Sequence, residues 1–193
     1  MQYLFLISAW AMFGLLHSVL AYSGFKRAML GLMKNKYKYY RLFYSAFATL
    51  NVLAIFWFHF TMRSNLLWQN SLAEKIAAAA LSIPAVIILV AAAKKYFLDL
   101  SGIDVLLKRL PVQAHLEQTG LHKWVRHPLY TGTLLLVWCI FLWNPSLANL
   151  ISAACITLYT RIGIYFEEKK LVQLFGDEYI VYASKVPMLI PGL

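Results

Sequence analysis

Charged residues are scarce in this chain of 193 residues, at 13% of the sequence, while hydrophobic residues make up 61% and the mean hydropathy is +0.63. This composition excludes an ordinary soluble domain, because a core of this size cannot hide so much apolar surface. The sequence therefore predicts a chain that lies in a lipid bilayer.

Cysteine is nearly absent, and glycine-rich motifs are missing. The 2 cysteines, Cys139 and Cys155, lie in apolar runs without metal-type spacing, so neither a disulfide framework nor a zinc site is indicated, and we expect no metal. The sequence also lacks a glycine-rich phosphate loop, an internal repeat and a low-complexity tract. We therefore interpret residues 1–193 as one domain, with three spans over 1–93 and a polar segment, a helical hairpin and a tail over 94–193.

Five apolar runs have about the length needed to cross roughly 30 Å of hydrocarbon as helices of some 20 residues. These runs cover residues 2–22, 42–61, 76–93, 129–143 and 147–166. We expect the first run to be a retained span and not a cleavable signal peptide, since no Lys or Arg precedes it and it is longer than the apolar core of a signal. The sequence thus predicts an all-α, polytopic helical membrane protein with about five transmembrane helices.

Lysine and arginine are unevenly distributed among the loops. They gather after the first, third and fifth runs, whereas the opposite side keeps only Arg63 and Lys75, and the turn "WNPS" carries no charge. Because basic loops stay in the cytoplasm, we expect the N-terminus outside and the C-terminal tail inside. The net charge of +10 is then explained by contact with anionic membrane lipids and not by nucleic acid.

The stretch "GLHKWVRHPLYTG", residues 120–132, places basic and histidine side chains directly before the fourth run. Pro128 suits the first position of a helix, because the N–H that it lacks would be unpaired there. The free N–H groups of such a helix start form a site for a carboxylate or a phosphate. The alternative is that Arg126 and His127 only anchor the chain at the membrane surface.

A second polar cluster, "RIGIYFEEKK", ends the fifth run. If the last two runs fold back on each other about Pro145, Pro128 lies level with about Ile162, since both arms rise roughly 1.5 Å per residue. The hairpin therefore brings the two polar clusters together.

Within this second cluster, Arg161, Tyr165 and Glu168 recur on one helical face, with Glu167 beside them. An ionisable residue such as Arg161 inside an apolar run is costly and is a functional candidate. Two alternatives remain open. Arg161 could extend to the interface and pair with Glu168, and the glutamates could form a solvated helix end, although their charge opposes the helix dipole there.

The two clusters together suit a zwitterionic ligand that also carries a cation, and S-adenosylmethionine has this character. Its carboxylate would lie at the helix-start N–H groups, and its ammonium, sulfonium or ribose hydroxyls would lie near the glutamates. Cofactors rich in phosphate fit less well, because Glu167 and Glu168 would repel them.

The motif "RHPLYTG" followed by "FEEKKLVQLFGDEYIVYASKVPMLIP" resembles the C-terminal half of the integral-membrane methyltransferases that include isoprenylcysteine carboxyl methyltransferase and phospholipid N-methyltransferases. In the first half, "LLHSVLA" and "YYRLFY" are similar to the NnrU and methanethiol S-methyltransferase branch. The resemblance implies an enzyme that binds S-adenosylmethionine in a cytoplasmic pocket. The cofactor contacts that it implies are Ala114, His115, Leu116, Glu117, His122, Arg126, His127, Pro128, Leu129, Tyr130 and Glu167.

Two positions depart from the family pattern. His122 stands where the family often has tyrosine, and Gly163 stands where the isoprenylcysteine branch places an arginine. The second departure argues against assuming an isoprenylcysteine substrate. The acceptor classes left open are a small thiol, a prenylcysteine carboxylate and a lipid amine, all apolar or membrane-partitioned.

The implied mechanism is a displacement at the sulfonium methyl that needs no metal and depends on holding both reactants in attack geometry. The catalytic candidates are His17 and Glu168, as acceptors of the substrate's proton, and Arg161, which we expect beside the gap where the acceptor enters. The alternative for His17 is a structural histidine bonded between helices. The tail predicts a helix ending near Ser184, followed by an apolar segment that covers the cofactor.

Two other classes of function remain open. An NADPH-dependent sterol-type membrane reductase shares a similar C-terminal layout, but would favour basic residues where Glu167 and Glu168 stand. A non-catalytic membrane module would bind no cofactor.

Overall fold

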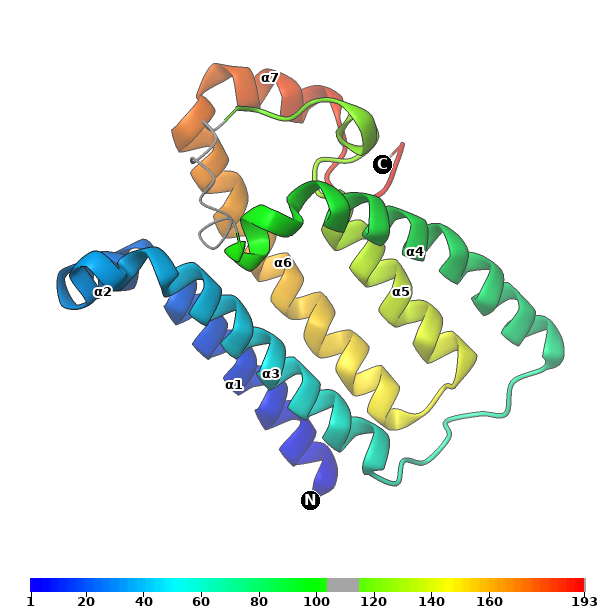
Figure 1. The fold of residues 1–193 in the computed structure, drawn as a ribbon. Helices are drawn as coiled ribbons and strands as arrows, with labels where there is room; N and C mark the ends of the chain where they lie inside the picture. Colours follow the sequence, from blue (N-terminus) through cyan, green and yellow to red (C-terminus); the bar gives the residue numbers. More distant parts are fainter. Residues whose placement is uncertain (104–114, 193) are drawn as a thin grey trace. The chain divides into compact units, whose positions relative to one another are not determined.

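The computed structural model describes residues 1–103 and 115–192, and helices dominate it (Figure 1). Its contacts divide the described chain into two units, residues 1–64 with 95–103, and residues 65–94 with 115–192. The helices are α1 (Gln2–Ala21), α2 (Ser23–Met33), η1 (Lys34–Tyr39), α3 (Tyr40–Thr61), α4 (Leu72–Ser101), η3 (Gly120–Lys123), α5 (Pro128–Trp143), α6 (Leu147–Phe175) and α7 (Asp177–Lys185).

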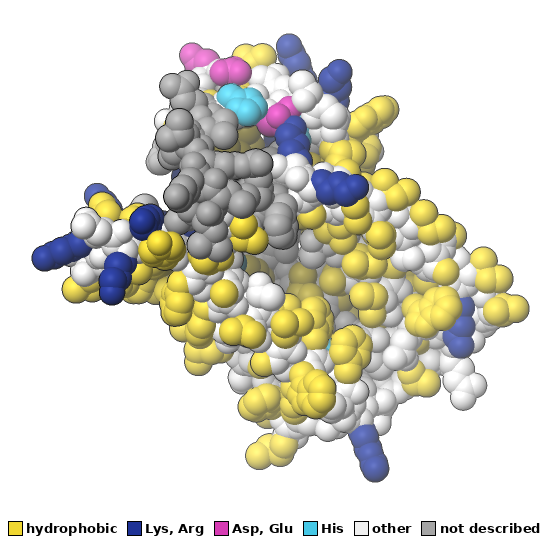
Figure 2. Space-filling model, in the orientation of Figure 1, with side chains coloured by type: hydrophobic (Ala, Val, Ile, Leu, Met, Phe, Trp, Pro, Cys, Tyr) yellow, Lys and Arg dark blue, Asp and Glu magenta, His cyan; other side chains and the backbone are white. Residues whose placement is uncertain are grey.

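The predicted polytopic helical membrane fold is confirmed. Within the described residues, 4 helical segments are long and apolar enough to cross a membrane, and α5 is apolar but shorter. These segments are Gln2–Ala21, Ser23–Thr61, Leu72–Lys95 and Leu147–Phe175. In Figure 2 hydrophobic side chains cover most of the visible face of α4, whereas acidic side chains gather where α7 lies.

Two helices run beyond the predicted apolar runs, because polar residues continue them. α6 includes the whole polar stretch up to Phe175, where Glu, Lys, Leu and Gln are all good helix formers. It ends at Gly176, whose φ of +55° glycine adopts without steric cost. α4 likewise continues to Ser101. Hydropathy located the apolar part of each helix and not its polar end.

In the first unit, α1 and α3 pack antiparallel. The amide of Gln2 donates to Arg63 O at 2.6 Å at one end, and the hydroxyl of Tyr40 donates to Leu20 O at 2.7 Å at the other. The segment between these helices forms α2 and η1, neither of which the sequence analysis predicted.

In the second unit, α5 and α6 form the predicted hairpin about Pro145. Ser146 caps α6 by accepting a hydrogen bond from Asn149 N at 3.2 Å, and the Asn149 amide donates to Asn144 O at 2.7 Å. The carbonyl of Pro145 also accepts from Leu67 N at 2.8 Å. The two local bonds of Asn149 hold the turn tight, and the bond from Leu67 ties the turn to the segment before α4.

Side chains of the hairpin meet further from the turn than helix rise alone predicts. The estimate placed Pro128 level with about Ile162, yet Tyr130, nearer the turn, reaches Glu167. Helical side chains tilt toward the N-terminus of their own helix. The Glu167 side chain on α6 therefore points toward the turn, and the Tyr130 side chain on α5 points away from it. The two displacements together bring these side chains level with each other.

Gly132 marks a close approach between α5 and α4. A Cβ atom at this position would lie 2.9 Å from Leu89 Cγ and 3.2 Å from Ala85 O. Gly163 in α6 is the matched contrast, since a Cβ atom there would have no neighbour within 4 Å.

We expect Gly132→Ala to lower the stability of the detergent-solubilised protein by about 1 kcal/mol net. Overpacking, at about 1–3 kcal/mol, outweighs the roughly 0.5–1 kcal/mol that alanine contributes inside a helix. Gly163→Ala is the control and should leave the melting temperature unchanged or raise it. Equal melting temperatures for the two variants would show that the α4–α5 contact is loose.

Candidate functional site

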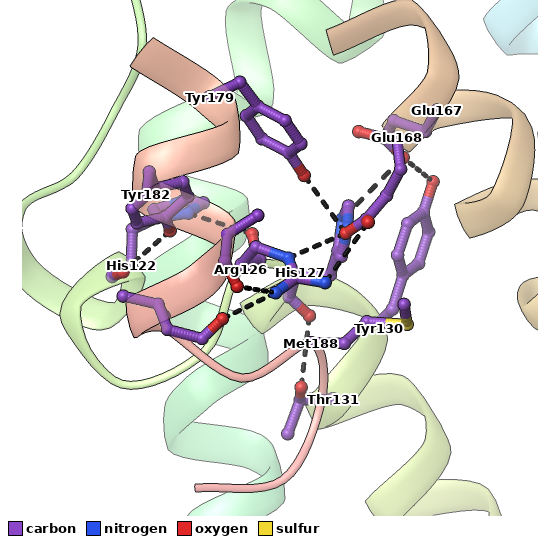
Figure 3. Close-up of polar contacts among 12 residues, drawn as sticks. His122, Arg126, His127, Tyr130, Thr131, Glu167, Glu168, Tyr179, Tyr182 and Met188 are labelled. Carbon is purple, nitrogen blue, oxygen red and sulfur yellow. Dashed lines mark hydrogen bonds and ion pairs between the residues drawn. The ribbon is translucent and has the colours of Figure 1, made fainter. Parts of the chain in front are cut away.

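The start of α5 carries the His127–Tyr130 box. His127 is the N-cap residue, its side chain makes no capping hydrogen bond, and Pro128 follows at the first helical position. His127 is 5% exposed, and its Nε2 lies 3.0 Å from Glu168 Oε1, so the ring donates to this carboxylate (Figure 3). The hydroxyl of Tyr130 donates to Glu167 Oε2 at 2.8 Å. The box and the two glutamates predicted to lie near it are therefore in contact.

Glu168 is the most heavily bonded carboxylate of this cluster. Its Oε1 accepts from Arg126 Nε at 2.7 Å, from His127 Nε2 at 3.0 Å and from the Tyr179 hydroxyl at 3.0 Å. Its Oε2 accepts from Arg126 Nη2 at 3.2 Å. Four donors favour the charged carboxylate and oppose protonation.

Arg126 connects this carboxylate to the C-terminal segment. Its Nη1 donates to Ala183 O at 2.8 Å and to Val186 O at 2.6 Å, and its backbone N–H donates to Pro187 O at 2.9 Å. The Arg126 side chain is only 10% exposed. The guanidinium thus ties α6 to the last turn of α7 and to the residues after it.

The tail after α7 lies against the start of α5. His127 N donates to Met188 O at 3.2 Å, and the Thr131 hydroxyl donates to Leu189 O at 2.8 Å. α7 ends at Lys185, next to the predicted end at Ser184. The tail therefore lies over the box, and its role as a cover of the cofactor stays a prediction.

Two tyrosines of α7 complete the cluster, and the sequence analysis missed both. Burial raises the pKa of Tyr179, and the adjacent Glu168 carboxylate raises it further. Burial also raises the pKa of Tyr182, although Arg126 partly opposes this rise. Both hydroxyls therefore stay protonated and donate, Tyr182 to His122 O at 2.8 Å. Their i, i+3 spacing on a predicted helix was the signal that could have placed them on one face.

Glu167 differs sharply from its neighbour. Its side chain is 42% exposed, its Oε2 accepts from Tyr130, and His127 Nδ1 lies 4.0 Å away. Among the described residues, no group donates a hydrogen bond to Glu167 Oε1. One oxygen of Glu167 is thus available to a ligand, whereas Glu168 is occupied by the protein.

The segment before α5 holds most of the other predicted cofactor contacts. His115 is largely exposed, with its Nε2 3.4 Å from Glu117 Oε2, and the Glu117 carboxylate also accepts from Thr119 N at 2.9 Å. His122 Nδ1 lies 3.1 Å from Arg126 O. Leu116 and Leu129 are half-buried, Pro128 is buried, and Ala114 lies outside the described residues.

Arg161 does not pair with Glu168, because Arg126 already occupies that carboxylate. Its Nη1 donates instead to Met188 Sδ at 3.2 Å, and among the described residues it has no acidic partner. The side chain lines a groove of about 590 Å³ on α6. The groove is lined by Arg161, Ile164, Tyr165, Glu168, Lys169, Val172, Gln173 and Met188.

His17 belongs to the first unit, where it bonds between α1 and α3. Its Nε2 lies 2.6 Å from the hydroxyl of Tyr44. A histidine that is bonded between two helices is what the structural alternative for His17 predicted. The catalytic role of His17 stays a prediction. For metals, the described residues contain no group of three or more His, Cys, Asp or Glu side chains placed to hold an ion.

These features define the class of protein: a polytopic helical membrane protein with a polar site where the arms of a helical hairpin end. A family model described as "NnrU protein" matches residues 5–188, so the chain belongs to the NnrU family. The family assignment suggested by the motifs is confirmed. No solved structure matches the chain.

Curated relatives carry methyltransferase names. The chain is 29% identical over 184 residues to methanethiol S-methyltransferase of Crocosphaera subtropica, covering 93% of this chain and 71% of that protein. It is 37% identical over 92 residues to methanethiol S-methyltransferase of Pseudomonas deceptionensis, covering 48% of this chain and 34% of that protein. It is 38% identical over 80 residues to protein-S-isoprenylcysteine O-methyltransferase of Saccharomyces cerevisiae, covering 39% and 32%. The chain thus aligns with about a third of the last two proteins.

We expect Arg126→Lys to loosen the tail and to lower stability by roughly 1–3 kcal/mol. A lysine ammonium cannot hold a carboxylate at two points and two carbonyls at once. Hydrogen exchange should show faster exchange of the backbone amides of residues 177–189. Lys123→Gln, at an exposed neighbouring position, is the control. Unchanged exchange in the tail of the Arg126 variant would contradict the role assigned to the guanidinium.

Proposed function

We propose that this protein transfers a methyl group from S-adenosylmethionine to an apolar or membrane-partitioned acceptor. The observation that carries the proposal is the contact between the His127–Tyr130 box and the Glu167–Glu168 pair. This contact joins the two motifs of a chain whose relatives are named methyltransferases.

The charges of the site fit this cofactor. The His127 side chain does not cap the start of α5, and a helix start of this kind suits the cofactor's carboxylate. Glu167 offers an exposed oxygen for an ammonium or a ribose hydroxyl. Arg126 compensates the charge of Glu168, which leaves Glu167 as the uncompensated anion of the cluster. This balance suits a cationic ligand better than a phosphate-rich one.

The bound cofactor would supply an electrophilic methyl group on its sulfonium. The chain's own residues would hold it in place, with Glu167 and Tyr130 on one side and the tail over the start of α5 as a cover. Glu168 accepts four hydrogen bonds, so we assign it to positioning His127 and Arg126 and no longer to taking the acceptor's proton. His17 remains the candidate for that proton.

The acceptor would reach the site through the groove on α6. Arg161 lies on this groove with an apolar wall of Ile164, Val172 and Met188 around it. A relative that aligns with 93% of this chain is named for methanethiol, so a small thiol is the first acceptor to test. From the basic loops we place the site on the cytoplasmic side of the membrane, where a water-soluble cofactor arrives.

Glu167→Gln should weaken binding of S-adenosylhomocysteine by about tenfold or more, because a charged hydrogen bond is replaced by a neutral one. Isothermal titration of the detergent-purified protein measures this change. Glu178→Gln, a surface carboxylate of α7 bonded to Gln118, is the control. Equal affinity of wild type and a folded Glu167 variant would remove Glu167 from the site, and binding of NADPH in place of S-adenosylhomocysteine would indicate a reductase.

Arg161→Ala and His17→Ala should lose methyl transfer while keeping affinity for S-adenosylhomocysteine, because the sequence assigns both residues, each within or at the edge of an apolar run, to the acceptor and not to the cofactor. The assay uses radiolabelled S-adenosylmethionine with methanethiol, a prenylcysteine and phosphatidylethanolamine as acceptors. Lys170→Ala, exposed on α6 outside the groove, is the control. Full activity in both variants, or transfer only to a charged and lipid-insoluble molecule, would contradict the proposed entry from the bilayer.

A further inference from the structure

The segment between α1 and α3 has a charge pattern unlike the rest of the chain. No Asp or Glu occurs before Glu74, while lysine and arginine crowd into residues 26–41. The basic side chains of this stretch are Lys26, Arg27, Lys34, Lys36, Lys38 and Arg41. Figure 2 shows Lys and Arg side chains gathered on α2. A surface with this charge attracts anions, and the neighbouring sequence offers no carboxylate to compensate it.

α2 is amphipathic. Phe25, Met29 and Met33 recur at helical spacing on one side and are half-buried, and Leu32 extends this apolar face outward with 75% of its surface exposed. No residue of α2 is fully buried. The apolar face is therefore only partly covered by the unit to which it belongs.

The position of α2 places this surface at the end of two membrane helices. α1 ends at Ala21, and the extended backbone of Tyr22 turns the chain into α2, which Figure 1 shows bent away from α1. η1 then leads into α3, which runs antiparallel to α1. A helix between the same-side ends of two antiparallel spans lies at the level of the lipid headgroups.

Exposed aromatic residues flank the segment at both ends. Tyr22 is 65% exposed and Tyr39 is 42% exposed, with the Lys38 ammonium 5.1 Å from the centre of the Tyr39 ring. Tyrosine is enriched at membrane interfaces because its ring is apolar and its hydroxyl is polar. Basic residues, exposed leucines and flanking tyrosines in one short stretch are the features of a helix that lies in the interface.

We propose that residues 22–39 form an in-plane membrane anchor that binds anionic phospholipid headgroups. Leu32 and the adjacent apolar face enter the acyl boundary, and the lysines of η1 contact the lipid phosphates. A nucleic acid would match the charge but would leave Leu32 in water, whereas an anionic lipid surface accommodates both the basic side chains and the apolar face. The proposal is independent of the methyl-transfer function.

The test is hydrogen exchange of the full-length protein in nanodiscs of phosphatidylcholine, with and without phosphatidylglycerol. Amides of residues 23–39 should exchange roughly tenfold more slowly or slower still when the anionic lipid is present. A variant that combines Lys34→Gln, Lys36→Gln and Lys38→Gln should lose this difference between lipids. Leu32→Ser should exchange faster in both lipids.

The control is Arg63→Gln with Lys75→Gln, which removes basic charge outside the segment and should keep the lipid difference. Equal exchange of residues 23–39 in both lipids would overturn the proposal, as would a lipid difference that survives in the triple lysine variant. Protection by added RNA or by an acidic protein, without any effect of phosphatidylglycerol, would identify a soluble partner instead.

Discussion

The ion pair between Arg126 and Glu168 is the interaction on which the rest of the site depends. Two charges this far out of water are stable only when their remaining hydrogen-bonding groups are satisfied. Here His127 and Tyr179 satisfy the carboxylate, and the carbonyls of the tail satisfy the guanidinium. The pair therefore joins the segment before α5, the end of α6 and the whole of α7 into one body.

Consecutive glutamates on α6 have opposite surroundings because successive helical residues point about 100° apart. Glu168 turns toward Arg126 and is held from several sides, while Glu167 turns toward Tyr130 and keeps an exposed oxygen. Structural stability and ligand contact thus fall on separate side chains. Glu167 can therefore be substituted while the hydrogen bonds between Glu168 and Arg126, which hold the tail, remain.

Much of the hairpin and part of the site could be predicted from the sequence. Pro128 and Pro145 mark the start of α5 and the turn, because the chemistry of proline is local. The partner of Glu168 could not be found in this way. Helical periodicity compares residues of one helix only, so it suggested Arg161 as the partner. The observed partner, Arg126, comes from the segment before α5.

The same limit explains the elements that were missed. Hydropathy detects residues that lipid surrounds, so it found the apolar runs of α1, α3, α4, α5 and α6 but not their polar extensions. α2 mixes lysine and glycine with its apolar residues, and no single stretch of it is apolar enough to be noticed. Tyr179 and Tyr182 look like ordinary surface residues until α7 is placed over the start of α5.

The length of α5 has a consequence for the surrounding membrane. Its 16 residues rise roughly 24 Å, against about 30 Å of hydrocarbon in a typical bilayer. This hydrophobic mismatch requires either that the lipids around the hairpin thin locally or that the start of α5 lies below the headgroups. In the first case the bilayer is thinner at the site, and in the second the His127 box lies deeper than an ordinary helix end. In both cases the thickness of the host membrane becomes a physical variable of the site.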